Sequence, residues 1–315
     1  MKTITLHVLP SVKCNNNCVF CIDRDGNELP SPEGFPAYFK KMLGKFGKVA
    51  DRVVFSGFEP TMSPDLPALM ELARAAGIRT IRIQTNGCRL ADRKYLLTLL
   101  KAGLNSVSMS IHGSSAGVHD NCTRHKGSFA AAMSGLRNLL SVKKASLPWL
   151  EVKTTSVICR HNIRDLKNLV RLLVQLEGVS HSGFNPMVLR GNALRDPARL
   201  LVRYSAILDA WRAVTGKLFA ASPQFRDRTG FTGMPACLLP EYNFRFGKYE
   251  SVICIIPGRA ELVKRDDEGG LKREKCAKCR FFENCPGIDG LYLDRYGWSE
   301  FKPVRSGPRD ARPAA

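Results

Sequence analysis

Three cysteines near the N-terminus have a spacing that points to metal chemistry. Cys14, Cys18 and Cys21 lie on one short segment, separated by three and by two residues. Iron–sulfur clusters take thiolate ligands, and a cubane has four irons, so three local cysteines leave one iron free to bind a substrate or cofactor. Zinc is the alternative, but a structural zinc site normally has four protein ligands, and no Cys or His lies within forty residues after Cys21.

A second group of cysteines lies near the C-terminus. Two residues separate Cys276 from Cys279, five more separate Cys279 from Cys285, and Cys237 and Cys254 lie upstream. Five thiols suffice for one [4Fe–4S] cluster with one to spare, and the spacing does not identify the spare. A zinc ribbon is the alternative. We also expect a β-hairpin over residues 242–252, with its turn at Gly247.

The remaining cysteines and the absence of an export signal indicate where in the cell the protein is expected to reside. Cys88, Cys122 and Cys159 have no metal spacing and are expected to be buried small hydrophobic residues or unreacted thiols. Eleven cysteines in a chain of 315 residues without an export signal favour metal sites and free thiols over disulfides. No apolar run is long enough to cross a membrane. We therefore expect a cytoplasmic protein without membrane attachment.

The cysteines must be positioned by alternating strands and helices. Strands are expected over residues 4–9, 52–56, 80–84, 106–111, 151–158 and 179–184. Helices are expected over 63–77, 92–102, 128–142, 163–177 and 198–214, with ends marked by Ser63, Gly77, Asp92, Gly103, Asn162, Gly178 and Gly216. Six β/α units imply a parallel sheet, either open or a partial barrel. The absence of a glycine-rich dinucleotide motif after the first strand weakens the open sheet.

This pattern predicts the organisation of the chain. The fold class is α/β, a partial (β/α)6 barrel over residues 1–190 with a small cysteine-rich C-terminal domain over residues 236–300. A helix and a linker are expected over 191–235, and a disordered tail over 301–315. In barrels of this kind the chemistry lies at the carboxyl ends of the strands, and the motifs described below fall there.

The first cysteine segment resembles the signature loop of the radical S-adenosylmethionine (SAM) superfamily, including the aromatic Phe20 before Cys21. After the second strand, Gly57-Phe58-Glu59-Pro60 is similar to the family's GGEP motif, with Phe58 in place of the second glycine. The resemblance implies that this motif receives the amino group of SAM.

Further similarities follow the next two strands. Thr85 and Asn86 lie at the end of the third, and the resemblance places them in the cofactor site together with Ser110 and Arg124, which follow the fourth. Ser110 would bond SAM's ribose or carboxylate. Arg124 would pair with the carboxylate, as a planar guanidinium can. His112 and His119 follow the same strand, and we assign neither of them an acid–base role.

The second cysteine group resembles the Twitch and SPASM domains that carry auxiliary [4Fe–4S] clusters in this superfamily. The next SPASM cysteine position is occupied by Asp289, and no cysteine follows Cys285. A single auxiliary cluster is therefore expected, held by three or four of the five cysteines between Cys237 and Cys285.

The resemblance implies an enzyme that cleaves SAM reductively to a 5′-deoxyadenosyl radical, which abstracts a hydrogen from its substrate. A reductant such as flavodoxin or ferredoxin would be needed. We expect oxidative tailoring or maturation of a peptide or small metabolite. Since the first strand begins at residue 4, no separate peptide-recognition domain is expected before the barrel.

Two alternatives remain. The formal net charge of +20 would suit an RNA-modifying radical SAM enzyme, although the basic residues are scattered and nucleic acid is not favoured. The other alternative is a non-enzymatic Fe–S or zinc-binding protein.

Overall fold

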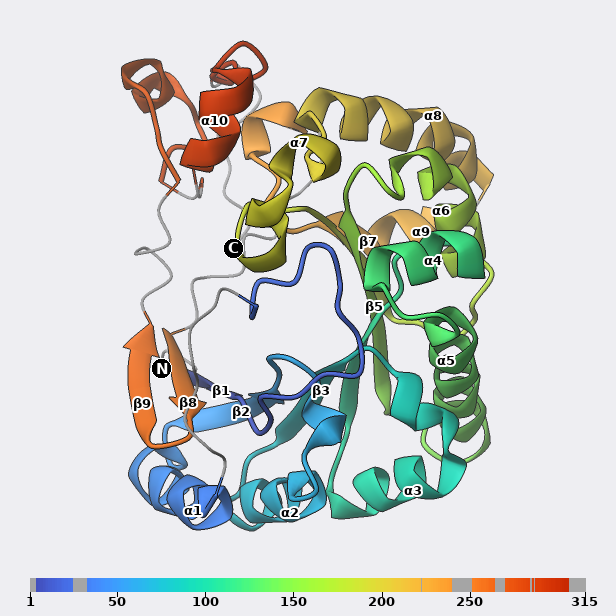
Figure 1. Cartoon of the computed structure of the whole chain (residues 1–315), viewed down its shortest axis with the longest axis vertical. Helices are drawn as coiled ribbons and strands as arrows, with labels where there is room; N and C mark the ends of the chain where they lie inside the picture. The colour runs from blue at the N-terminus through green and yellow to red at the C-terminus, as the bar shows by residue number, and fades with distance from the viewer. Residues whose placement is uncertain are drawn as a thin grey trace.

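The structure is a computed structural model that describes residues 4–24, 33–221, 223–239, 251–263, 270–283, 285 and 287–305. Its described strands form one nine-stranded sheet in the order β7-β6-β5-β4-β3-β2-β1-β8-β9. All neighbouring pairs are parallel except β8 and β9. The sheet curves around an interior and carries helices on its outer side (Figure 1). The expected α/β fold with a partial barrel is confirmed.

The strands begin and end close to the expected positions. Their bounds are β1 Ile4–Val8, β2 Ala50–Phe55, β3 Thr80–Thr85, β4 Ser106–Ser110, β5 Glu151–Ile158, β6 His181–Pro186, β7 Thr229–Phe231, β8 Ser251–Ile256 and β9 Arg259–Val263. The first six correspond to the six strands expected from β-branched runs in the sequence.

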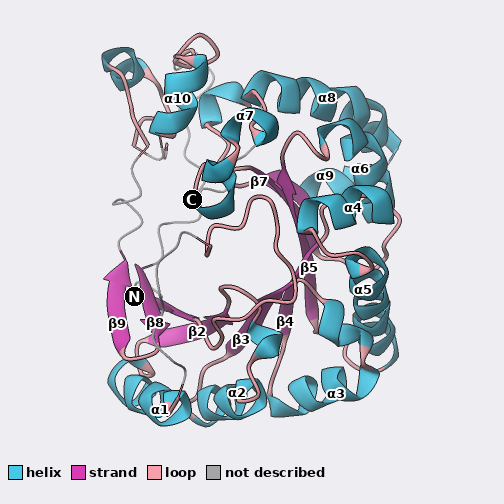
Figure 2. Cartoon of the chain, in the orientation of Figure 1, coloured by secondary structure: helices cyan, strands magenta, loops and turns pink. Residues whose placement is uncertain are grey.

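Most helices lie on the outer side of the curved sheet, and α7 and α10 lie at its upper opening in Figure 2. Their bounds are α1 Phe35–Phe46, α2 Leu66–Ala75, α3 Arg93–Ala102, α4 Ala116–Thr123, α5 Ser128–Ala145, α6 Leu166–Val174, α7 Pro197–Leu200, α8 Tyr204–Ala221, α9 Pro223–Asp227 and α10 Gly290–Tyr296. No described helix has both the length and the apolar composition needed to cross a membrane.

The two faces of the sheet differ in chemistry because successive strand residues point to opposite sides. On the outer face Leu6, Val53 and Ile81 stand in register on β1, β2 and β3, and all three are buried in the core. On the inner face Arg82, Ser106 and Glu151 stand in register on β3, β4 and β5. The apolar face packs against the helices, which leaves a polar face toward the interior.

Helix ends follow their local chemistry at α3 and depart from the expected positions at the start of α2. The Asp92 carboxylate accepts bonds from the Lys94 and Tyr95 amides, and Gly103 ends α3 with φ 116°, as expected. Ser63, expected as an N-cap, instead ends a short 3-10 turn, η1 (Pro60–Met62), and α2 begins after Asp65.

Two further helix predictions are corrected. The helix expected over 163–177 divides into a 3-10 turn, η3 (Ile163–Asp165), and α6, which ends at Val174. The expected stop at Gly216 is wrong, because α8 continues through it to Ala221. One glycine costs only about 1 kcal/mol in a helix, less than tertiary packing can supply.

The region expected as helix and linker, 191–235, includes a strand. β7 pairs in parallel with β6 and extends the sheet by one strand. The linker interpretation is therefore wrong at 229–231.

The C-terminal third is also tied to the barrel. Residues 242–250 of the expected hairpin lie outside the described residues, and the hairpin that the structure describes is β8–β9, with Gly258 in its turn at φ 76°. β8 pairs in parallel with β1, so residues 251–263 belong to the main sheet and not to a separate small domain. Phe301, expected in a disordered tail, is buried against Tyr204 and Tyr292. Residues 306–315 of that tail lie outside the described residues.

Candidate functional site

Residues 10–24, which we call the cysteine loop, follow β1 and cross the interior of the curved sheet (Figure 1). Four backbone hydrogen bonds connect this loop to segments that follow β2, β4 and β6: Glu59 N to Lys13 O at 3.1 Å, Asn17 N to Thr123 O and Val19 N to Cys122 O, both at 2.9 Å, and Asn192 N to Cys21 O at 2.9 Å. The loop is thus held from three sides at the carboxyl end of the sheet.

Side chains add further connections. The Asn86 amide, after β3, donates to Asn15 Oδ1 at 2.6 Å. The Asn192 amide donates to the Cys18 carbonyl at 2.8 Å. The Phe20 ring meets the His112 ring edge-on, with centroids 4.7 Å apart. Phe20, expected to bind the cofactor, therefore packs against the end of β4.

The three thiols of the loop influence one another. Burial, with a smaller contribution from the neighbouring Cys21 thiolate, raises the pKa of Cys14 to about 11 and the pKa of Cys18 to about 12. The positive charge of the Arg24 guanidinium opposes this rise and acts to lower the pKa of all three thiols. Thiolates that repel one another in a half-buried space are suited to a cationic metal group. The donor set therefore fits an iron–sulfur cluster.

The thiols do not converge on one point. Within the described part of the chain, no three His, Cys, Asp or Glu side chains are arranged to hold a single metal ion. A cubane does not require such convergence, because each thiolate binds a different iron and the ligands surround a volume.

Glu59 connects the ends of β2 and β3. It is fully buried, and its Oε1 accepts from the Thr61 amide at 3.0 Å, the Thr61 hydroxyl at 2.5 Å and the Thr85 hydroxyl at 2.6 Å. Its Oε2 accepts from the Asn86 amide N–H at 2.8 Å. Burial raises the pKa of Glu59, and the four donors oppose that rise. The structure thus brings Glu59, Thr85 and Asn86 together.

The turn before Glu59 packs closely against Leu9, the residue that follows β1. Gly57 has φ 76°, and a Cβ there would lie 2.6 Å from Leu9 Cγ. Phe58 also has a positive φ, 38°, and its amide donates to Asp23 Oδ2 at 2.9 Å. Pro60 begins η1. The backbone of this motif therefore faces the cysteine loop although Phe58 replaces a glycine.

Ser110 and Arg124, the two residues at and after the end of β4 that are expected to contact SAM, differ in their exposure. Ser110 is half-buried and pairs in register with Thr155 on the inner face. Arg124 is exposed at the end of α4 with φ 53°, and no hydrogen bond or ion pair of its side chain is found among the described residues.

His112 and His119 are buried acceptors. The His119 Nδ1 accepts from the His112 amide at 3.1 Å, and the His112 Nδ1 accepts from the Val157 amide at 3.2 Å. Burial lowers the pKa of His119 to about 4 and the pKa of His112 well below its usual value. Both rings are neutral at physiological pH and hold the end of β4.

Four of the five C-terminal cysteines line one small cavity of about 30 Å³: Cys237, Cys276, Cys279 and Cys285. Burial, followed by the charges of the other three, raises the pKa of Cys237 to about 12. Cys254 does not line this cavity, because it lies on β8, opposite His7 of β1. The structure therefore gathers four cysteines and leaves Cys254 in the main sheet.

Of the isolated cysteines, Cys122 and Cys159 are fully buried, as expected. Cys88 is half-buried, and after burial the charges of Glu59 and Cys14 raise its pKa to about 12. It therefore lies near the cysteine loop, a position that its spacing did not indicate.

Sequence reasoning missed several residues that fix the loop. Asn16 and Arg24 lie on the loop, and Gly191 and Asn192 contact it. Only the isolated glycine after the sixth strand offered a local signal.

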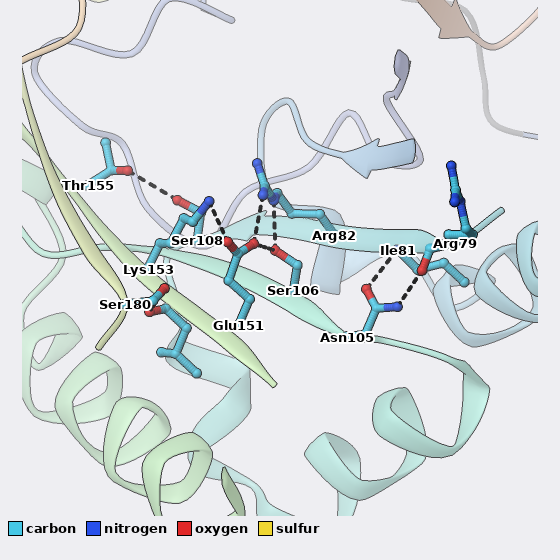
Figure 3. A network of polar contacts seen from close by, with 11 residues as sticks. Arg79, Ile81, Arg82, Asn105, Ser106, Ser108, Glu151, Lys153, Thr155 and Ser180 are labelled. Carbon is cyan, nitrogen blue, oxygen red and sulfur yellow. Dashed lines mark hydrogen bonds and ion pairs between the residues drawn. The ribbon is translucent and has the colours of Figure 1, made fainter. Parts of the chain in front are cut away.

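The interior below the loop contains a charged network (Figure 3). The Glu151 carboxylate accepts from Arg82 at 2.8 Å, from Lys153 at 2.7 Å and from the Ser106 hydroxyl at 2.6 Å. Burial would raise the pKa of Glu151, but these three partners hold it at about 2. Two cations share one carboxylate, so the inner face carries surplus positive charge here.

Comparison with known families matches residues 8–173 to the Radical SAM superfamily. The Fe-coproporphyrin III synthase of Methanosarcina barkeri is 34% identical over 243 residues, which are 75% of this chain and 55% of that protein. The chain spans about half the length of the curated relatives it matches.

Two solved structures share the fold. Streptococcus suis SuiB bound to the precursor peptide SuiA superposes with a TM-score of 0.64 and 14% identity over 96% of this chain and 75% of that one. The protein anSMEcpe with bound AdoMet and Cp18Cys peptide superposes with a TM-score of 0.63 and 15% identity over 96% of this chain and 93% of that one. At these identities the likeness establishes the fold.

Proposed function

Because this chain belongs to the radical SAM superfamily, we propose that Cys14, Cys18 and Cys21 hold a [4Fe–4S] cluster with one open iron and that the protein cleaves SAM reductively. The observation that carries this proposal is the fixing of the cysteine loop by backbone hydrogen bonds from the segments after β2, β4 and β6. When bound, the reduced cluster would supply the electron that breaks a C–S bond of SAM and yields a 5′-deoxyadenosyl radical.

The chain's own residues would orient SAM. We place its amino group at the backbone of Gly57 and Phe58, because that turn faces the loop, and we assign Glu59 to fixing the turn. Ser110 on the inner face would bond the ribose or carboxylate. Arg124 is exposed and would pair with the carboxylate only if its side chain turned toward the loop.

We further propose one auxiliary [4Fe–4S] cluster, in a Twitch- or SPASM-like site held by Cys237, Cys276, Cys279 and Cys285. The cavity that these four cysteines line supports this choice, and the place of Cys254 in β8 makes it the spare. Four protein ligands leave no open iron. The auxiliary site would therefore accept an electron and would not bind the substrate.

The substrate would be a peptide or small metabolite bound on the polar inner face of the sheet. Removal of a hydrogen atom followed by transfer of one electron to the auxiliary site amounts to a net oxidation of the substrate. A flavodoxin or ferredoxin would supply the first electron. A reducing cytoplasm suits the free thiols.

Single-turnover chemistry tests the proposal. Anaerobically reconstituted protein, reduced with dithionite and mixed with SAM, should release 5′-deoxyadenosine, and Cys18→Ala should release none. Release by the Cys18→Ala variant at the wild-type rate would contradict the assignment.

A further inference from the structure

Asn16 carries a buried donor for which the described residues provide no acceptor. Asn16 is 4% exposed, and its Oδ1 lies 2.8 Å from His125 Nδ1. Because an amide oxygen only accepts, the ring nitrogen must donate. The amide nitrogen, Asn16 Nδ2, is buried and has no hydrogen-bond partner among the described residues. Buried polar groups are rarely left unsatisfied, so the nitrogen is expected to have an acceptor that the described residues do not supply.

The position of Asn16 indicates what that acceptor is. The residue lies between Cys14 and Cys18, and its backbone N–H already donates to Cys14 Sγ at 3.4 Å. Its carbonyl accepts from Arg24 Nη2 at 3.1 Å, and Arg24 Nε is a second buried donor without a described partner. Two buried donors without a described partner, on the loop that carries the three thiols, indicate an acceptor-rich group beside that loop. The sulfur atoms of an iron–sulfur cluster are such acceptors.

His125 fixes the direction of the amide. It lies in the turn between α4 and α5, which Asp120 holds by accepting from the Gly127 amide at 2.7 Å and the Phe129 amide at 2.8 Å. With Oδ1 bound to this turn, Nδ2 occupies the other position of the planar amide.

We infer that Asn16 Nδ2 donates a hydrogen bond to a sulfur atom of the cluster and thereby raises its reduction potential, with His125 as the positioning residue. The inference rests on the proposed cluster at Cys14, Cys18 and Cys21. Reduction adds one negative charge to the cluster, so a donor stabilises the reduced form more than the oxidised form. The Arg24 guanidinium acts in the same direction.

A redox titration followed by EPR on the full-length, reconstituted protein tests this. The signal of the first cluster is the one that is lost in Cys18→Ser. Asn16→Ala should move its midpoint to a more negative potential, and Asn16→Asp should move it further, because a carboxylate replaces the donor while an acceptor for His125 is kept. His125→Ala should give a smaller negative shift. Asn17→Ala is the matched control, since this exposed amide lies on the same loop. Its Oδ1 accepts from Asn192 Nδ2, which keeps its bond to the Cys18 carbonyl in the variant, so the variant should titrate as wild type.

An unchanged midpoint in Asn16→Ala or Asn16→Asp overturns the inference. If both variants lose their iron, His125→Ala decides, because it leaves every loop residue in place: a negative shift supports the inference and an unchanged midpoint overturns it. Failure of the proposed function is distinguishable, since wild-type protein would then show no EPR signal that depends on Cys18.

Discussion

The backbone N–H of Asn192 donates to the carbonyl oxygen of Cys21 at 2.9 Å and so connects the segment after β6 to the cysteine loop. The contact is possible because residue 191 is glycine. Gly191 has φ 56°, and a Cβ there would lie 2.2 Å from the Cys21 carbonyl oxygen and 2.9 Å from that of Ile22. Both obstacles are backbone atoms, so a larger residue would have to displace the loop.

Gly191→Ala should therefore impair the first cluster specifically. Strain of about 1–3 kcal/mol would be relieved by moving Cys21, and we expect at least about tenfold slower SAM cleavage with incomplete iron loading. Gly216→Ala is the control, since a Cβ there meets nothing within 4 Å. That change lies in α8 and should stabilise the protein by roughly 0.5–1 kcal/mol without affecting cleavage. Normal loading and rate in Gly191→Ala would refute the steric argument.

The separation of Cys254 from the other C-terminal cysteines gives a second prediction. Cys279→Ala should lose about four irons per chain, retain SAM cleavage and stop forming product, because the auxiliary site can no longer accept an electron. Cys254→Ala should keep all of its iron. Iron and sulfide analysis of the two purified variants provides the comparison. If Cys254→Ala loses iron and Cys279→Ala does not, the proposed ligand set is wrong.

Glu59 should contribute to stability through its hydrogen bonds. In Glu59→Gln the new amide nitrogen must face either the Thr61 amide or the Asn86 amide, so one buried N–H loses its acceptor. We expect a loss of about 1–3 kcal/mol in the free energy of unfolding. Thr61→Val, which removes one hydroxyl donor to Glu59 and keeps the side-chain shape, should cost less. Urea unfolding of both variants measures the difference, and equal costs would contradict this assignment.

Glu151 should make stability depend on pH. Its pKa in the folded protein is about 2, below the ordinary value of 4.5, so its contribution is present above about pH 4.5 and is lost as the pH falls toward 2. Because 36% of its side chain is exposed, solvent screens the ion pairs, and we expect only about 1 kcal/mol at neutral pH. Glu151→Gln should be less stable by that amount at pH 7 and equal to wild type near pH 2. A constant difference across this range would argue against the network.

Local sequence signals were sufficient for the barrel and for the grouping of the first three cysteines. Cys14, Cys18 and Cys21 are neighbours in the chain, so their spacing alone brings them together. The first six strands follow from β-branched runs, and α3 follows from Asp92 and Gly103, whose capping roles depend on backbone geometry nearby.

Non-local contacts were not predictable in this way. The parallel pairing of β8 with β1 joins segments about 250 residues apart, and it decides that Cys254 is separate from Cys276. The bonds from Asn192 and His125 to the cysteine loop likewise depend on the folded barrel. Their residue types are common in loops, so nothing in the sequence distinguishes them.

The most direct test of the central claim uses the Cys276→Ala/Cys279→Ala variant, in which the cysteine loop carries the remaining cluster. Reconstituted anaerobically with ⁵⁷Fe, it should bind about four irons per chain, and SAM should change the Mössbauer signal of one iron, the one without a protein ligand. Zinc bound at the loop, or four irons that do not respond to SAM, would contradict the account.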